Sequence, residues 1–386
     1  MWRLPTISQR LPLKKNIPPK YIPTTHPPKN IPTKPSPQPI PQKTIPTKTI
    51  PTTPKPSLLD HTPHTRQPLT PKNRFPLITT MRPSILKVLA YFDLFSYPVT
   101  CGEILLFLDK EVSPVDLTLQ LEELIHEGLL FRDEEFYSLR NDPALTTRRN
   151  RGNRHADELL KIAGRISRRL YRFPYVRGIG ISGSLSKHFA DEHADIDYFI
   201  ITRRNRLWIA RTLMHCFKKF MYLTNRQHWY CMNYYVDEDA LEIKEKNIFT
   251  ATEMITLLPA SGNGGLVRFF DANSWTERYF PHYKYRSKEA PGPVPTSFVK
   301  TALEKLLDNR WGDRLDDLLQ RWTSRRWQKK EQRGDRNVKG NQMSLRNGKH
   351  FSRPNPENFQ QSILDRYNRR LNELQTQWGL QSTHAS

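Results

Sequence analysis

The chain has 386 residues, with 61 Lys and Arg against 38 Asp and Glu, and its 32 prolines are twice as many as its 16 glycines. Residues 1–80 hold 20 of the prolines and 13 of the basic residues but only one acid. The other 306 residues have an ordinary globular composition and a net charge of +11, and the length suggests two or three domains. No run approaches the roughly 18 apolar residues of a membrane span, and the three cysteines lack disulfide-framework or zinc-site spacing. We therefore expect a soluble, cytoplasmic protein without a membrane partner.

Residues 1–80 repeat Pro, Thr, Ile and Lys, as in NIPTKPSPQPIPQKT. Proline removes backbone donors and disfavours helix interiors, so this segment is expected to be a disordered, extended arm. It also lacks Gly, Ala, Val and Glu and has a single Asp, and the codons of these five residue types all begin with G. We therefore hypothesise that the segment reflects a nucleotide bias and that translation starts at Met81. A transit peptide or a nucleic-acid-binding arm is the alternative.

Residues 82–145 are expected to form a small domain of three helices and a hairpin. Apolar residues at helical spacing predict the first helix, a second lies near residues 102–108, and Ser113 caps the third. The alternation in LLFRDEEFYSLR predicts the hairpin. Together these elements resemble a winged-helix domain. The third helix carries four acids and neither Lys nor Arg, which favours a structural or protein-contact role over DNA binding. A basic linker, residues 146–155, is expected to follow.

The most informative segment is VRGIGISGSLSKHFADEHADIDYFIIT, which starts at residue 176. It predicts a buried strand that ends at Gly183 and Ser184, and a second strand that carries Asp195 and Asp197. Residues i and i+2 of a strand share a face, and two adjacent carboxylates are costly unless a cation lies between them. Mg²⁺ is the natural occupant, because carboxylates and substrate phosphates hold this ion. Gly183 lets a ligand approach the backbone and Ser184 opens the following helix, so both are expected to bind phosphates.

This pattern of Gly-Ser, a gap and Asp-x-Asp between apolar residues resembles the nucleotidyltransferase fold of the DNA polymerase β superfamily, over residues 154–275. The resemblance implies an α/β (α+β) core in which helices flank a small mixed sheet. It also implies that Asp195 and Asp197 are the catalytic metal ligands. By the same match, Gly183 and Ser184 hold the triphosphate.

The family also has a third carboxylate on a later strand, which here falls within residues 228–239. At the place where an Asp is expected, this chain has Asn233. Asp237, Glu238 and Glu242 come at or beyond the end of that strand. Either one of these acids moves into the site or the third carboxylate is missing.

Three further elements complete the expected core. A long helix spans residues 206–222, a helix covers residues 247–262, and a strand and turn follow at residues 265–281. Lys187 follows the Gly-Ser pair by three residues, and Glu253 lies on the predicted helix 247–262. Either could approach a bound phosphate or metal, but both are expected to be surface residues.

The C-terminal region, residues 296–386, is expected to be helical, with a mobile basic loop at residues 331–353. Thirteen basic and five acidic residues between Arg310 and Arg353 accompany three tryptophans. This composition suits a phosphorylated or nucleic-acid acceptor, whereas the tryptophans could equally be core residues beside solvated arginines. A last amphipathic helix, residues 356–378, is expected to pack over the cleft.

The sequence therefore predicts a Mg²⁺-dependent nucleotidyltransferase that transfers a nucleoside monophosphate from an NTP, expected to be ATP, to a hydroxyl acceptor. The acceptor could be a small molecule, a protein or an RNA, and nucleic acid is an expected partner of the basic C-terminal region. The alternative is a non-catalytic nucleotide- or nucleic-acid-binding protein with the same fold.

Overall fold

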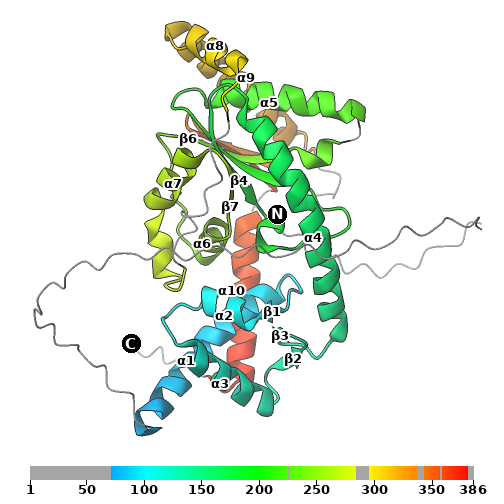
Figure 1. The fold of residues 1–386 in the computed structure, drawn as a ribbon, viewed down its shortest axis with the longest axis vertical. Coiled ribbons are helices and arrows are strands. Elements are labelled where there is room, and N and C mark those ends of the chain that lie inside the picture. Colours follow the sequence, from blue (N-terminus) through cyan, green and yellow to red (C-terminus); the bar gives the residue numbers. More distant parts are fainter. Residues whose placement is uncertain (1–70, 225, 284–294, 337–342, 357–358, 381–386) are drawn as a thin grey trace, which may run out of the picture. The chain divides into compact units, whose positions relative to one another are not determined.

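The computed structural model describes residues 71–224, 226–283, 295–336, 343–356 and 359–380 (Figure 1). Within these ranges the chain forms ten α-helices and two β-sheets, one of three strands and one of six. None of the helices in these ranges is both long enough and apolar enough to cross a lipid bilayer.

The N-terminal part folds as three helices and a small antiparallel sheet, in which β3 lies between β1 and β2. The three predicted helices and the hairpin are present. Thr100 and Glu103 form a capping box at the start of the second helix, and Ser113 caps the third. The elements are α1 (Pro71–Asp93), β1 (Val99–Thr100), α2 (Cys101–Phe107), α3 (Pro114–His126), β2 (Phe131–Asp133) and β3 (Phe136–Ser138).

The first helix starts earlier than predicted. It begins at Pro71, so residues 71–80 are helical although the sequence predicts a disordered segment up to residue 80. Proline suits the first turn of a helix, where its missing N–H has no intrahelical partner to lose. The helix therefore runs through Met81, which is buried. The remainder of that segment, residues 1–70, lies outside the described residues.

The basic segment predicted as a linker is helical. Residues 146–155 belong to α4 (Pro143–Tyr171). Arg149 is only 3% exposed, because its guanidinium pairs with Glu103 at 2.8 Å and lies 3.8 Å from the ring centroid of Tyr97. These contacts compensate part of the segment's positive charge. The helix therefore continues without a break from the N-terminal part to the main sheet.

The main sheet has the strand order β7-β4-β5-β6-β9-β8. Strands β4 and β5 are antiparallel, with Ser182 opposite Asp197, whereas β5 and β6 are parallel and are connected through α5 (Figure 1). The predicted strand at residue 176 and the predicted helix after residue 206 are both present. The elements are β4 (Val176–Ser182), β5 (Asp197–Thr202), α5 (Leu207–Met221), β6 (Cys231–Asp237) and β7 (Leu258–Ser261).

Different helices cover the two faces of this sheet (Figure 1). Tyr198 and Ile200 point to one face, where they join a buried cluster with residues of α4 and α5. Phe199 points to the other face and packs with residues of α6 (Ile248–Ile255) and α7 (Asn263–Ala272). The alternation along β5 thus separates the sheet into two buried layers.

Helix and strand are exchanged relative to the prediction after residue 255. The predicted helix 247–262 ends at Ile255 and is followed by β7, and the predicted strand at 265–281 begins instead with α7. Gly262 has a φ of +82°, and a Cβ on Gly265 would lie 2.8 Å from the carbonyl oxygen of Arg177. These glycines let α7 start directly against β4, and this close approach is a tertiary contact that periodicity does not report.

The loop expected at residues 331–353 contains two strands of the main sheet. β8 (Met343–Asn347) and β9 (Phe351–Pro356) form a hairpin, and β9 pairs with β6. Asn347 and Gly348 lie between two runs of alternating residues, and an Asn-Gly pair in such a place is a hairpin signal. The prediction of a loop did not use this signal. Residues 337–342, which belong to the same predicted loop, lie outside the described residues.

Three helices complete the described C-terminal part: α8 (Phe298–Leu306), α9 (Arg310–Gln332) and α10 (Phe359–Gln377). Helix α9 packs against α5, and α10 packs against both α6 and α1. Arg370 on α10 pairs with Asp93 on α1 at 3.0 Å. The last helix therefore connects the N-terminal part with the face of the sheet that carries α6.

Candidate functional site

A pocket opens on the α6 side of the main sheet, beside the end of β4. It encloses about 840 Å³ of free space, including open solvent at its mouth. Its polar end is formed by Ser182, Gly183, Asp197 and Asn233. Its apolar walls are formed by Phe199, Tyr234, Ile243, Phe249, Met254, Leu257, Phe269 and Phe359. The remaining lining residues are Thr250, Glu253, Arg353 and Gln360.

Gly183 directly follows β4 and has a φ of +75°, in the left-handed region that favours glycine. Ser182 and Gly183 line the pocket, whereas Ser184 is not among the lining residues. The helix expected to open at Ser184 is a single 3-10 turn, Leu185–Lys187, and the Ser184 side chain makes no capping hydrogen bond in it. A turn of this length lacks the N-terminal field of an α-helix. The predicted helix start at Ser184 is therefore wrong, whereas phosphate binding at Gly183 and Ser184 stays a prediction, and of these two residues only Gly183 lines the pocket.

The two predicted metal ligands differ in position. Asp197 is the first residue of β5, is nearly buried and lines the pocket. Asp195 precedes the strand and accepts a hydrogen bond of 3.0 Å from Nδ1 of His228. Burial, followed by the nearby carboxylates of Asp197 and Asp195, raises the pKa of the Cys231 thiol to about 11. Of the two acids, only Asp197 forms part of the pocket wall.

Asn233 occupies the place beside Asp197 that the third carboxylate was expected to take. Its Nδ2 donates a hydrogen bond to Oδ1 of Asp197, and its Oδ1 accepts one of 3.4 Å from Sγ of Cys231. The pairing of β5 with β6 shifts register at this point, so that Asn233 and the following Tyr234 both line the pocket. An amide thus replaces a carboxylate next to the buried acid.

The three acids considered as replacements lie elsewhere. Asp237 is paired with Thr202, at the opposite end of β5 from the pocket, and Glu238 directly follows it. Glu242 pairs with Lys246 at 2.7 Å. None of these three acids lines the pocket.

Lys187 and Glu253, expected at the surface, form an ion pair beside the pocket, and of the two only Glu253 lines it. Lys187 is buried, and its Nζ lies 2.8 Å from Oε1 of Glu253 and 3.1 Å from the carbonyl oxygen of Gly183. Burial lowers the pKa of this lysine below its ordinary value, against the opposing effect of Glu253. The Tyr97 hydroxyl donates a 2.7 Å hydrogen bond to the Lys187 carbonyl oxygen, so the N-terminal part supports this turn. The surface prediction for Lys187 is wrong because it took no account of that packing.

The C-terminal elements close the pocket, in agreement with the prediction for the last helix. Arg353 of β9 pairs with Glu245 at 2.8 Å and lies 5.4 Å from the ring centroid of Tyr234. Phe359 of α10 contacts Phe249 edge to face, with 6.0 Å between ring centroids. Sequence reasoning missed Arg353 because its segment was interpreted as a loop. Recognition of the hairpin would have placed it beside β6.

A second group of polar residues lies at the far end of β6. Asp237, Asp239 and His350 bring one ligand atom each to within 4.8 Å of the others. The Asp237 carboxylate already accepts hydrogen bonds from the backbone N–H groups of Asn205 and Asp239, at 3.0 Å each. It also accepts one of 2.8 Å from Nδ1 of His350. These bonds hold the β8–β9 turn against β6, which gives the group a structural role.

No protein-family model, curated protein or solved structure matches this chain. Its function is therefore argued from the pocket itself.

Proposed function

We propose that the chain is a Mg²⁺-dependent nucleotidyltransferase whose NTP, expected to be ATP, binds in the pocket beside Gly183. The main support for this proposal is that Gly183 and Asp197 both line one end of an aromatic pocket. These residues come from adjacent ends of β4 and β5, as in the Gly-Ser and Asp-x-Asp pattern of the nucleotidyltransferase fold.

The pocket divides into parts that suit the two halves of a nucleotide. The polar end offers the backbone at Gly183, which suits phosphate oxygens, and the ion pair of Lys187 with Glu253 lies beside it. The opposite walls offer Phe249 and Tyr234, which suit the flat, largely apolar surface of a base. We therefore place the triphosphate near Gly183 and the base among the aromatic side chains.

The carboxylate oxygens of Asp195 and Asp197 are ligands of the kind that Mg²⁺ prefers, together with substrate phosphates. Asp197 lines the pocket and Asp195 lies two residues before it in the chain. When bound, the ion would neutralise charge on the phosphates. The chain's own residues would orient the reactants: the backbone at Gly183 would face the phosphates, and Asn233 would hold the Asp197 carboxylate through its hydrogen bond.

In the proposed reaction an oxygen of the acceptor hydroxyl forms a bond to the α-phosphorus. The bond from that phosphorus to the pyrophosphate oxygen breaks, and pyrophosphate leaves with the electron pair. The hydroxyl proton is released to solvent. Positioning and charge compensation supply the catalysis in such a transfer, and the residues around Gly183 and Asp197 are arranged for both.

Asn233 favours a second function, nucleotide binding without transfer. An amide cannot act as a base for the acceptor hydroxyl, and as a metal ligand it supplies one neutral oxygen without the charge of a carboxylate. A protein of this kind would bind the nucleotide in the same pocket and release it unchanged. Formation of pyrophosphate separates the two functions.

The test is calorimetric titration of the full chain with each NTP, with and without Mg²⁺. We expect Mg²⁺-dependent binding that is lost in the double variant Asp195→Ala/Asp197→Ala. The matched control is Asp133→Ala/Glu135→Ala, which removes the same charge from the exposed tip of the β2–β3 hairpin. A folded wild type that binds none of the NTPs would contradict both functions.

A further inference from the structure

The outer side of α9 carries a row of large apolar side chains that face solvent. Trp311 is 72% exposed, Leu318 57% and Trp322 55%. At about 100° per residue these three positions lie within about 40° of one another around the helix axis. The side of α9 that packs lies about 100–120° around the axis from Trp311, since Gly312 and Thr323 are buried. For Trp311 and Trp322, the interpretation of the tryptophans as core residues is therefore wrong.

Basic side chains surround this row. Arg314 lies 5.2 Å from the ring centroid of Trp311, and Arg326 lies 5.8 Å from that of Trp322. Arg325 lies about 40° to one side of the row, and Lys329 is in line with it. In the described part of the chain, no carboxylate pairs with Arg325, Arg326 or Lys329. The four acids of α9 lie at least about 120° around the axis from Trp311.

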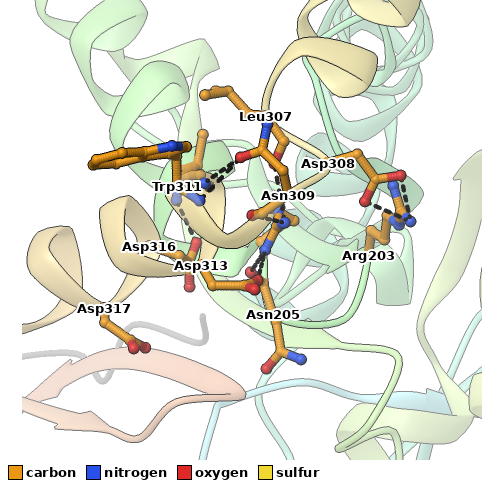
Figure 2. Close-up of polar contacts among 12 residues, drawn as sticks. Arg203, Asn205, Leu307, Asp308, Asn309, Trp311, Asp313, Asp316 and Asp317 are labelled. Atoms are coloured by element: carbon orange, nitrogen blue, oxygen red, sulfur yellow. Dashed lines mark hydrogen bonds and ion pairs between the residues drawn. The ribbon is translucent and has the colours of Figure 1, made fainter.

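The helix is held in place from its packed side, so the exposed row is pre-organised. Figure 2 shows the polar network at the start of α9, with the Trp311 ring extending away from it. Arg206, at the start of α5, donates to Asp313 at 2.5 Å and to the carbonyl oxygen of Leu307 at 3.0 Å. Arg203 adds an ion pair with Asp308 at 3.0 Å. Ordering this surface on binding would therefore cost little.

We propose that the outer side of α9 binds single-stranded nucleic acid. Flat aromatic rings that alternate with cations suit such a strand, because bases stack on the rings while the cations pair with phosphates. A membrane surface is a poorer fit. A helix that lies in lipid needs an apolar stripe of roughly 100° or more, and here Arg325 and Lys329 interrupt a narrower row.

This surface is separate from the pocket. Helix α9 packs on α5, which covers the sheet face opposite to the one that carries Phe199 and α6. The inference therefore does not rest on the proposed nucleotide site. A nucleic acid bound here would be anchored by α9 whether or not the pocket performs chemistry.

The test measures fluorescence anisotropy of a labelled 20-nucleotide oligo(U) titrated with the full chain at several salt concentrations. We expect Trp311→Ala/Trp322→Ala to weaken binding about tenfold or more without altering the salt dependence, because stacking is lost and charge is kept. We expect Arg325→Gln/Arg326→Gln to weaken binding and also to flatten the salt dependence, because two phosphate contacts are lost. These side chains are exposed or flank the exposed row, so the variants should keep the wild-type melting temperature.

The matched control is Lys161→Gln/Arg165→Gln, which removes the same charge from the exposed side of α4, where no aromatic row is present. It should retain most of the affinity. Equal losses in the control and in the α9 charge variant would overturn the proposal, since binding would then follow net charge alone. Absence of oligo(U) binding would also overturn it. Tighter binding of the full chain to phosphatidylserine vesicles than to oligo(U) would overturn it as well, because α9 would then be a membrane-surface helix.

Discussion

At the scale of single residues, the hydrogen bond between Asn233 and Asp197 determines the charge at the polar end of the pocket. The amide compensates a nearly buried carboxylate without adding a second negative charge. A carboxylate at residue 233 would instead place two anions side by side, which is unfavourable unless a cation joins them. With an amide at residue 233, this end of the pocket therefore carries one carboxylate instead of two adjacent ones.

We predict that Asn233→Asp lowers the unfolding temperature in the presence of EDTA and that Mg²⁺ restores much of the loss. The expected cost without metal is about 1–3 kcal/mol, the range for an unsatisfied buried polar group. Thermal unfolding of the full chain, with EDTA and with MgCl₂, measures the effect. Asn141→Asp, in the exposed loop before α4, is the matched control and should respond to neither. An Asn233→Asp protein that is equally stable in both conditions would argue against a cation near Asp197.

At the scale of elements, α5 is capped by a residue of another helix. The carboxylate of Asp316 on α9 accepts a 2.9 Å hydrogen bond from the backbone N–H of Ile209, in the first turn of α5. Its other oxygen is buried and has no hydrogen-bond partner in the described part of the chain. Burial, only partly opposed by the backbone N–H groups of Ile209 and Trp208, raises the pKa of Asp316 to about 7.

A carboxyl group whose pKa rises on folding binds its proton more tightly in the folded state. The free energy of unfolding should therefore fall as the pH rises from about 4 to about 7. We predict that Asp316→Asn removes this dependence, because the amide oxygen can still accept from Ile209 and carries no charge. The melting temperature of the variant relative to wild type should rise by about 5 °C between pH 5 and pH 8. Asp317→Asn, next to it on α9, should show no such trend, and a parallel trend in both variants would refute the assignment.

The elements that the sequence predicted well are those with strong local signals. Ser113 marks the start of α3, and the alternation in residues 176–182 marks β4. The misplaced elements depend on distant partners: β9 exists because it pairs with β6, and α7 starts where glycines allow it to approach β4. Gly183 and Asp197 could be identified in advance for the same reason, because a local motif carries them.

The rest of the pocket could not be predicted in this way. Lys187, Glu253 and Arg353 lie on three elements that are far apart in the sequence. Only packing brings Glu253 and Arg353 to the pocket wall and Lys187 against Glu253. Each was taken for a surface or loop residue because charged side chains usually are. The positions of such residues follow from the tertiary structure and not from their neighbours in the chain.

At the scale of the molecule, α4 connects the N-terminal part with the main sheet through a buried arginine. Arg149 pairs with Glu103 on α2 and lies over the rings of Tyr97 and Phe136. Tyr97 in turn supports the turn at Lys187, beside the pocket. The N-terminal part therefore helps to hold the turn beside the pocket in place.

We predict that Arg149→Met lowers the free energy of unfolding by about 3 kcal/mol, because it leaves the Glu103 carboxylate without its buried partner. Urea denaturation of the full chain measures the loss. Arg151→Met is the matched control on the same helix: Arg151 is 66% exposed and lies 3.4 Å from Glu192, so its removal should cost less than about 1 kcal/mol. Equal losses would show that Arg149 does not connect the two parts.

The central claim is that a nucleotide binds between Gly183 and the aromatic walls of the pocket. The most direct measurement is photocrosslinking of the full chain with 8-azido-ATP and Mg²⁺, followed by mass spectrometry of the labelled peptides. Because the base is placed beside Tyr234 and Phe249, the label should appear in peptides from β6 or α6, and unlabelled ATP should compete it away. Competable label confined to α9, or to any segment outside the pocket wall, would contradict the claim.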